Sequence, residues 1–390
     1  MPQLSDRVGT FTDSVIRRMT RINNQYNSIN LSQGFPDFDP PKELLNALAK
    51  TAYQGPHQYA VTFGAQNFRE ALAKKTSPAL HHEVDPNTEI CVTCGGTEAM
   101  MAAMMTICNP GDKVMIFSPF YENYGADAIL SGAEPIYIPL VPPTYEFDLS
   151  LIEKGFAEGA KALILCNPSN PCGKVFSKQE LSVIAELAIR YDAYVITDEV
   201  YEHIVYAPYE HQYLAAMPGM RERTIICNSL SKTYSITGWR LGYVIAPPEI
   251  ADRIKKVHDF LTVGAAAPLM EAAVTGLRFG DEYYRQLAEH YTHMKELFTG
   301  GLRDMGFHFT EPQGAYYVLL DVSEFGVTDD LAFCEWLARE VGVGAVPGSS
   351  FFKEEIHNYI RFHFAKKDET LLAALDRLSG FREKYRSING

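Results

Sequence analysis

The segment around Lys232 contains the residues of this 390-residue chain that are best suited to covalent chemistry. A lysine becomes a nucleophile toward carbonyl compounds where a folded site lowers its pKa and orients its amine, and an arginine with clustered hydroxyl groups commonly binds phosphate. The segment therefore predicts a site that holds an aldehyde cofactor as a Schiff base and binds its anionic tail. The alternative is a Lys–Arg pair in a Ser- and Thr-rich surface turn. The full segment is Ser229-Leu-Ser231-Lys232-Thr-Tyr-Ser-Ile-Thr237-Gly238-Trp239-Arg240-Leu-Gly242.

A carboxylate and an amide follow two further apolar runs. Asp198 ends one run and is followed by Tyr201, while Asn170 lies in the turn-forming segment Asn167–Gly173. A buried aspartate needs a charged or hydrogen-bonded partner, and a protonated pyridine nitrogen would be one. Asn170 could donate to a phenolate oxygen or to a substrate carboxylate. A structural ion pair for Asp198 and an Asx-turn for Asn170 are the alternatives.

Two weaker signals concern a phosphate and an aromatic ring. Gly95-Gly96-Thr97 runs directly into a predicted helix, whose amides and positive dipole end can bind phosphate, although this is also an ordinary helix N-terminus. The segment is neither a dinucleotide-binding GxGxxG pattern nor a P-loop. Tyr121 follows another apolar run, and its ring could stack on a planar cofactor or pack in the core.

Arg361 lies in an alternating segment that predicts a strand. It shares one face with Tyr359 and His363, and an arginine on an open strand face is normally solvated. Beside a site, its planar guanidinium would match a carboxylate in bidentate fashion. The residues alone leave both interpretations open.

The composition limits the class of protein. A hydrophobic fraction of 46% and a charged fraction of 21% are ordinary for a globular protein, and no apolar run approaches the ~20 residues of a membrane-spanning helix. The net charge of −13 argues against a nucleic-acid partner. Residues 1–21 lack the apolar core of a signal peptide, so we expect a cytoplasmic protein. The CxxC pair Cys91/Cys94 lacks a second such pair, and we expect packed thiols in a reducing compartment.

Apolar runs alternate with helical periodicity over residues 45–273. Short, nearly continuous apolar strands that alternate with helices predict an α/β fold, with a mainly parallel sheet covered by helices on both faces. The predicted helices are Pro41–Ala52, Asn67–Lys75, Thr97–Cys108, Lys178–Tyr191 and Pro248–Leu261, and the predicted strands are Glu89–Cys94, Val114–Phe117, Ala162–Cys166, Tyr194–Thr197, Ile225–Cys227 and Leu241–Ile245.

The pattern changes from residue 281 onward. We predict a large cofactor-binding α/β domain over residues 45–273, and a smaller α+β domain, residues 1–40 with 281–390, that completes the substrate site. The predicted elements of the smaller domain are the helices Asp281–Met305, Asp329–Val341 and one from Asp368, and the strands Phe307–Thr310, Tyr316–Leu320 and Asn358–Phe364.

The chemical motifs follow predicted strands. Ligands in parallel sheets lie at the carboxyl ends of the strands, so a site assembled from loops is expected there. The motifs at these ends are Gly95-Gly96-Thr97, Asn167–Asn170, Asp198 and Ser229.

Together these residues match a known family. Over nearly its full length the chain resembles the class I, fold-type I pyridoxal-phosphate-dependent aminotransferases (PLP-dependent transaminases), and it is most similar to the branch that includes kynurenine/glutamine enzymes and prokaryotic aspartate and aromatic enzymes. The matched segments are Leu31-Ser-Gln-Gly34-Phe-Pro36-Asp37-Phe38, Gln58-Tyr59 with Gly64, Gly95-Gly96-Thr97, Pro119-Phe-Tyr121, Asn170-Pro-Cys-Gly173, Asp198-Glu-Val-Tyr201, Ser229–Gly242 and Arg361.

The resemblance implies pyridoxal 5′-phosphate as the cofactor and a role for each matched residue. Lys232 would form the Schiff base and shuttle the proton between the substrate Cα and the cofactor, and Asp198 would pair with the pyridine nitrogen. Tyr59 would reach the phosphate of the neighbouring subunit, which implies a homodimer with shared sites. The other implied roles are the 3′-oxygen for Tyr201 and Asn170, the phosphate for Gly96, Thr97, Ser229 and Arg240, ring stacking for Tyr121, and the substrate α-carboxylate for Gly34, Asn170 and Arg361.

The implied activity is transfer of an amino group from an L-amino acid to a 2-oxo acid by a ping-pong mechanism, without a metal. Aromatic, bulky apolar or glutamine-like substrates are favoured. The sequence offers no obvious second arginine for a side-chain carboxylate, although aspartate stays possible. A cysteine-conjugate β-lyase on the same cofactor is the alternative, and a non-enzymatic ligand-binding protein on this fold is a more remote one.

Overall fold

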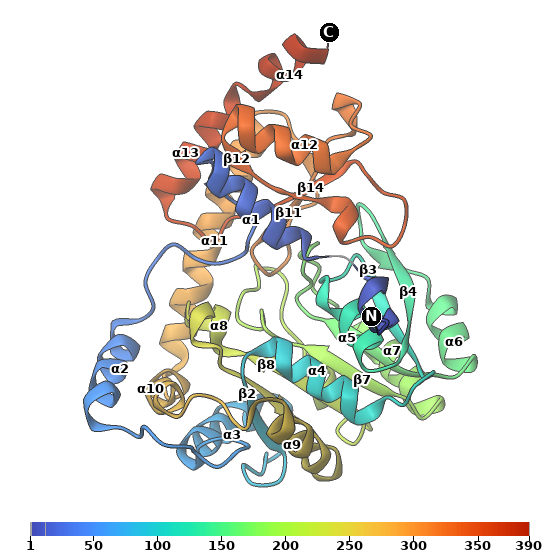
Figure 1. Cartoon of the computed structure of the whole chain (residues 1–390), viewed down its shortest axis with the longest axis vertical. Helices are drawn as coiled ribbons and strands as arrows, with labels where there is room; N and C mark the ends of the chain where they lie inside the picture. Colours follow the sequence, from blue (N-terminus) through green and yellow to red (C-terminus); the bar gives the residue numbers. More distant parts are fainter. Residues whose placement is uncertain (1, 12, 390) are drawn as a thin grey trace.

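Eight strands form the sheet that carries the predicted motifs (Figure 1). Strands β8, β7, β6, β3 and β4 pair in parallel in that order. Strand β9 is antiparallel to both β2 and β8, which gives β2 and β8 the same direction, and β5 is antiparallel to β4. The predicted mainly parallel sheet is confirmed. The strands, in spatial order, are β2 (Ile90–Thr93), β9 (Gly242–Ile245), β8 (Thr224–Ser229), β7 (Tyr194–Asp198), β6 (Ala160–Cys166), β3 (Lys113–Ser118), β4 (Glu134–Val141) and β5 (Glu146–Phe147).

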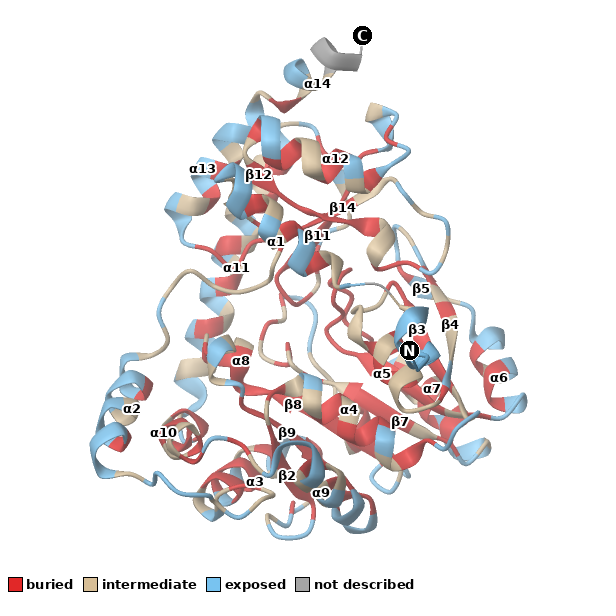
Figure 2. Cartoon of the chain, viewed as in Figure 1, coloured by how far each residue is buried: buried red, intermediate tan, exposed pale blue. Residues whose placement is uncertain are grey.

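Helices cover both faces of this sheet in the computed structural model, which describes residues 2–11 and 13–389. Successive strand residues point to opposite faces, so Val114 and Ile116 of β3 pack with α4, α5 and α9, whereas Met115 packs with α6 and α7. The central strands β3 and β6 are correspondingly buried along nearly their whole length (Figure 2). The covering helices are α4 (Gly96–Ile107), α5 (Asn123–Leu130) and α9 (Pro248–Thr262) on one face, α6 (Leu149–Ala157) and α7 (Lys178–Arg190) on the other, and α2 (Lys42–Gln54), α3 (Gln66–Leu80) and α10 (Ala267–Leu277) around the β2 end.

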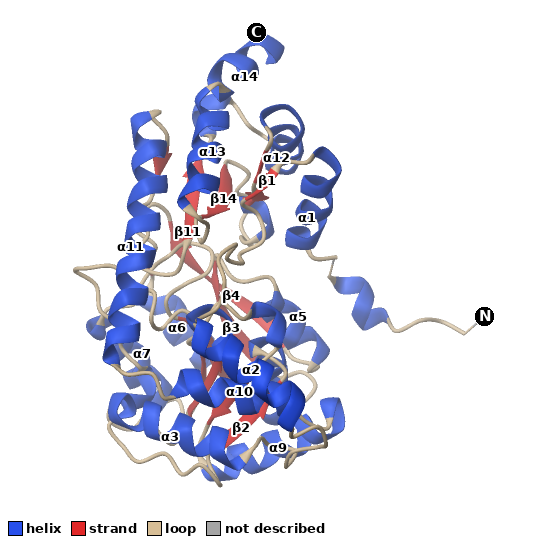
Figure 3. Cartoon of the chain, turned by 90° about the vertical axis from the view of Figure 1, so that its left-hand side faces the viewer, coloured by secondary structure: helices blue, strands red, loops and turns tan. Residues whose placement is uncertain are grey.

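A four-stranded antiparallel sheet, in the order β10-β11-β14-β13, forms the second part of the fold. The long helix α11 runs alongside both parts (Figure 3). The strands are β10 (His308–Phe309), β11 (Tyr317–Asp321), β13 (Val346–Pro347) and β14 (Tyr359–His363), and the helices are α11 (Asp281–Asp304), α12 (Asp330–Trp336), α13 (Asp368–Ser379) and α14 (Phe381–Asn389).

The start of the chain returns to this second part. Helix α1 (Val15–Tyr26) leads into β1 (Ile29–Asn30), which pairs in parallel with β12 (Val343–Gly344). We propose on this basis that the chain has two domains, one of residues 45–273 and one of residues 1–40 with 281–390. Residues 1, 12 and 390 of the second domain lie outside the described residues. No helix in the described ranges is long and apolar enough to cross a membrane.

Some elements were not predicted from the sequence because their apolar residues show no clear helical or strand periodicity. Helix α10 is buried around much of its circumference and therefore shows no apolar stripe. Strand β4 contains prolines and is only partly buried, so its alternation is weak. The predicted helix Asp329–Val341 is α12 followed by a π-helical turn at Leu337–Val341.

Candidate active site

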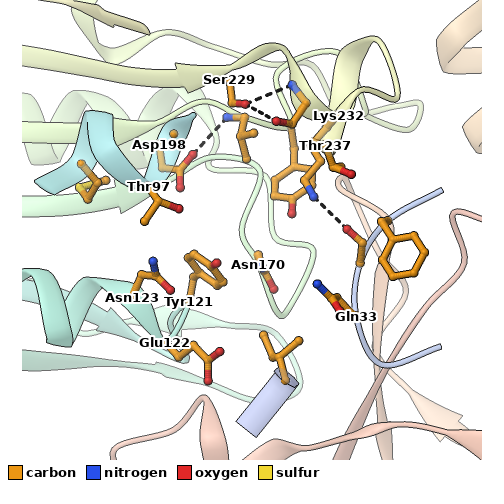
Figure 4. Close-up of a pocket in the computed structure, with 18 of the residues that line it drawn as sticks. Gln33, Thr97, Tyr121, Glu122, Asn123, Asn170, Asp198, Ser229, Lys232 and Thr237 are labelled. Carbon is orange, nitrogen blue, oxygen red and sulfur yellow. Dashed lines mark hydrogen bonds between the residues drawn. The ribbon is translucent and has the colours of Figure 1, made fainter. Parts of the chain in front are cut away.

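The strand register brings the predicted motifs to one edge of the large sheet. Cys166, Asp198 and Cys227 are register partners across β6, β7 and β8. A cavity of about 500 Å³ opens at this edge, between the two sheets (Figure 4). The predicted site residues that line it are Gly34, Gly96, Thr97, Tyr121, Asn170, Asp198, Tyr201, Ser229, Lys232, Arg240 and Arg361.

Lys232 lies on the short helical turn α8 (Leu230–Thr233), directly after β8. Its Nζ donates a hydrogen bond to the carbonyl oxygen of Gly34 at 2.9 Å, and the hydroxyl of Tyr316 donates to the same oxygen at 2.9 Å. Burial lowers the pKa of the Lys232 amine to about 8, assisted by the positive charges of Arg240 and Arg361. The amine can therefore lose its proton close to neutral pH.

Amide, hydroxyl and guanidinium donors converge at the start of α4. Gly95 precedes the helix with a φ of +89° and makes no side-chain cap, which leaves the first amides of α4 free of a side-chain acceptor. A Cβ atom on Gly95 would collide with Nη2 of Arg240, so glycine is needed for this close approach. The Ser229 Oγ lies 2.6 Å from Ser231 Oγ on the adjacent turn. This donor set suits a phosphate group.

Asp198 is the last residue of β7, and it faces the cavity beside α5. Its Oδ2 accepts a hydrogen bond from the hydroxyl of Tyr124 at 2.7 Å, and its Oδ1 accepts one from the amide of Val200 at 3.2 Å. Burial raises the pKa of the Asp198 carboxyl, and these two donors oppose the rise. Tyr124 was not predicted as a site residue, although its position one helical turn after Tyr121 was a usable signal.

Arg361 is buried, with 1% of its surface exposed, so the possibility of an open strand face is wrong. The Tyr317 and Phe351 rings enclose its guanidinium, with centroids 4.3 and 4.4 Å from Cζ. Nη1 donates to Asn170 Oδ1 at 2.7 Å, and Nη2 donates to the Ser32 carbonyl oxygen at 2.9 Å. Its buried Nε has no partner within the described ranges. The guanidinium plane is thereby fixed at the cavity wall.

Tyr201 and Tyr59 lie in very different surroundings. The Tyr201 hydroxyl lies 2.9 Å from that of Tyr317 inside the cavity wall. Tyr59, in contrast, is 88% exposed and does not line the cavity of its own chain.

Helix α1 contributes an unpredicted wall. Ile16 and Arg17 line the cavity, and Glu122 binds the start of the helix by accepting from the Ser14 hydroxyl and, at 3.2 Å, from the Val15 amide. No signal within the sequence around residue 17 indicates this placement, because it depends on the pairing of β1 with β12 far along the chain.

The comparisons with known proteins identify the family. A model of the family "Aminotransferase class I and II" matches residues 26–378. Methionine aminotransferase of Escherichia coli (strain K12) is 37% identical over 379 residues, covering 97% of this chain and 96% of that protein. Kynurenine–oxoglutarate transaminase 1 of Homo sapiens is 32% identical over 394 residues, covering 92% of this chain and 93% of that protein.

A solved structure agrees with these sequence matches. The crystal structure of an Escherichia coli protein with a methionine aminotransferase function has a TM-score of 0.92 and 36% identity, covering 97% of this chain and 99% of that chain. The chain belongs to the class I and II aminotransferases. It is an aminotransferase, and pyridoxal 5′-phosphate is the cofactor of this family. Because the matched relatives are named as aminotransferases, the β-lyase alternative is not favoured.

The residues of the cavity fit this cofactor. A buried amine suits its aldehyde, and the donors around Gly95 suit its phosphate. A carboxylate that already accepts a hydrogen bond from Tyr124 suits a protonated ring nitrogen.

The pH dependence of Lys232 can be measured directly. Only the neutral amine attacks an aldehyde, so the rate of covalent cofactor attachment should rise about tenfold per pH unit and level off above a midpoint near pH 8. The measurement is the absorbance change when the cofactor-free protein is mixed with pyridoxal 5′-phosphate between pH 6 and 10. A rate that continues to rise through pH 9, as for a lysine with the ordinary value of 10.5, would contradict the lowered pKa.

Proposed function

We propose that the enzyme transfers the amino group of an L-amino acid to a 2-oxo acid by a ping-pong reaction with Lys232 as its central base. The observation that carries this proposal is the placement of a buried amine with a lowered pKa between a phosphate-type donor set and the Asp198 carboxylate. When bound, pyridoxal 5′-phosphate supplies an aldehyde that exchanges amino groups and a ring that withdraws electrons.

The proton transfers are assigned to Nζ of Lys232. In its neutral form, this nitrogen would take the proton from Cα of the substrate and deliver it to C4′ of the cofactor. The Gly34 carbonyl, 2.9 Å away, holds the free amine in the cavity between these events. Burial, assisted by the positive charges of Arg240 and Arg361, lowers the pKa of this amine to about 8 and so favours release of its proton.

The Asp198 carboxylate supplies the negative charge that keeps a ring nitrogen protonated. Tyr124 holds this carboxylate in place through its 2.7 Å hydrogen bond. Tyr121 would stack on the ring, and Tyr201 with Asn170 would donate to the 3′-oxygen. Gly96, Thr97, Ser229 and Arg240 would bind the phosphate.

Arg361 is assigned to the substrate α-carboxylate, together with Asn170 and the Gly34 backbone. The buried Nε has no partner in the described chain, and the enclosing rings fix the guanidinium plane. A carboxylate can therefore bind without reorganisation of the arginine.

The substrate side chain is expected to point toward α1. Thr20 donates to Gln33 Oε1 at 2.9 Å, which leaves the amide nitrogen of Gln33 as a donor facing the cavity (Figure 4). Arg17 lines the same region, so the chain has a second arginine that was not recognised from the sequence. Beside Ile16, these donors favour a side chain that combines apolar length with an acceptor, such as that of glutamine, and they also admit an acidic one.

A homodimer with shared sites is supported by an exposed apolar surface. Tyr53, Tyr59 and Phe260 are 91%, 88% and 92% exposed. His258 on α9 lies 2.9 Å from the Thr62 carbonyl, which places the loop that carries Tyr59 next to the end of α9. Such a surface is typical of a subunit interface.

A cytoplasmic location is also proposed. The seven cysteines are all free, and most are buried, as expected for a reducing compartment.

The central test replaces Lys232. The variant Lys232→Ala should lose the absorbance band of the covalently bound cofactor, and turnover should fall about a thousandfold or more, because the base is removed. Borohydride reduction of the wild type followed by peptide mapping should place the pyridoxyl group on Lys232. A label on another lysine, or full activity of the variant, would refute the assignment.

The dimer prediction uses two substitutions in the exposed surface. Phe260→Asp places a charge in the proposed interface and should shift the protein from dimer to monomer in sedimentation. Tyr59→Phe should leave the dimer intact and weaken cofactor binding about several-fold, because one hydrogen bond to phosphate is lost. A wild-type monomer with full activity would contradict shared sites.

The substrate prediction compares two neighbouring arginines. Arg17→Met should lower kcat/KM for glutamate and aspartate by about threefold to tenfold, the range expected for a partly solvated charge, and should leave methionine within about twofold. Arg18→Met is the matched control, because Arg18 pairs with Glu335 at 2.6 Å and does not line the cavity. Equal effects of Arg17→Met on all substrates would exclude side-chain selection by Arg17.

A further inference from the structure

Asp127 is a buried carboxyl group in the cavity wall to which the proposed reaction assigns no role. It lies on α5, one helical turn after Tyr124, and only 3% of its surface is exposed. Its Oδ2 has no hydrogen-bond partner among the described residues. A buried carboxylate without a partner is strongly destabilised, so the group requires either a proton or a cation that the chain itself does not provide.

The second carboxyl group of this region is Asp198. Both residues line the cavity, and the thiol of Cys227 on β8 lies within the electrostatic range of both. Tyr124, on the same helix as Asp127, donates to Asp198 at 2.7 Å. Burial and the negative charge of Asp198 raise the pKa of Asp127 to about 8. Asp127, which is buried beside a second carboxyl group and whose Oδ2 has no partner among the described residues, therefore carries a proton at neutral pH.

Among the described residues around α5, no cation is bonded to Oδ2 of Asp127. Tyr137 on β4 lies against Gly125, and Cys227 is a buried thiol. Arg7 binds the Leu130 carbonyl at 3.2 Å, at the far end of the helix and exposed to solvent. Lys232 lies near Asp198, and its amine donates its hydrogen bond to the Gly34 carbonyl oxygen.

We propose that Asp127 is a second carboxyl group for the cationic ring of the cofactor, one that holds a proton in the free protein and releases it when the ring is bound. The step is balanced: Asp127 changes from a carboxylic acid to a carboxylate, the proton leaves to solvent, and the positive ring nitrogen compensates the new charge. Asp127 is thus a positioning residue that acts alongside Asp198. This inference rests on the proposed placement of the ring nitrogen near Asp198.

The test counts protons. Cofactor-free protein is titrated with pyridoxamine 5′-phosphate, which does not link covalently to Lys232, by calorimetry at pH 7 in buffers of different ionisation enthalpy. Wild type should release about one proton more than Asp127→Asn, because asparagine has no proton to lose. Other titrating groups, including Lys232, contribute to the number of protons released in both proteins, so their contribution cancels in the difference. Asp376→Asn, an exposed aspartate on α13, is the matched control and should release as many protons as wild type.

A second measurement needs no variant. In the infrared spectrum of wild type, the carbonyl band of a protonated carboxyl group should be present in the free protein and should disappear when pyridoxamine 5′-phosphate is bound. Equal proton counts in wild type and Asp127→Asn, or persistence of that band, would overturn the proposal. Failure of the proposed function is distinguishable, since pyridoxal 5′-phosphate would then form no covalent band with Lys232 at all.

Discussion

The parallel alignment of β6, β7 and β8 is the constraint on which the site depends. The loops that follow these strands must leave the sheet at one edge, because Cys166 and Asp198, the last residues of β6 and β7, are register partners and Asp198 pairs with Cys227 near the end of β8. The antiparallel β9 completes this edge, since Gly242 pairs with Ser229 and places Arg240 beside it. A Cβ atom at Gly242 would collide with the backbone of Gly95. Glycine at this position therefore serves the packing that brings the start of α4 against β9.

Charge is distributed unevenly in a chain whose net charge is −13. The cavity wall nevertheless contains cations at the proposed phosphate and substrate positions, whereas Asp198 lies beside α5 and Asp127 lies on it. Such a separation suits a ligand with an anionic tail and a cationic ring. Burial lowers the pKa of Lys232 and raises that of Asp127, and in each case like charges nearby, Arg240 and Arg361 for the amine and Asp198 for the carboxyl group, shift the pKa in the same direction as burial.

The sequence was sufficient to predict what local patterns encode. The strands that end at Asp198 and Ser229, and the helix that follows Gly95, were predicted within a few residues, because apolar runs and glycine turns mark them. The burial of Arg361 was not predictable, since its enclosing rings come from β11 and from the segment after β13. The position of Arg17 depends likewise on contacts between the two ends of the chain. Local patterns thus predicted the residues for the chemistry, while tertiary contacts determine where Arg361 and Arg17 lie in the cavity wall.

The segment from Tyr121 to Asp127 combines a local sequence pattern with tertiary contacts. Its residues line the cavity and have different partners: Tyr121 lies at the proposed ring, Tyr124 binds Asp198, and Glu122 binds the start of α1. Tyr124 and Asp127 are three residues apart on α5 and lie along one side of this helix, and Tyr121 lies just before it. This one short segment therefore contacts both the carboxylate that faces the proposed ring nitrogen and the start of α1. A substitution in this segment should consequently alter cofactor binding and substrate choice together, which separate loops would not do.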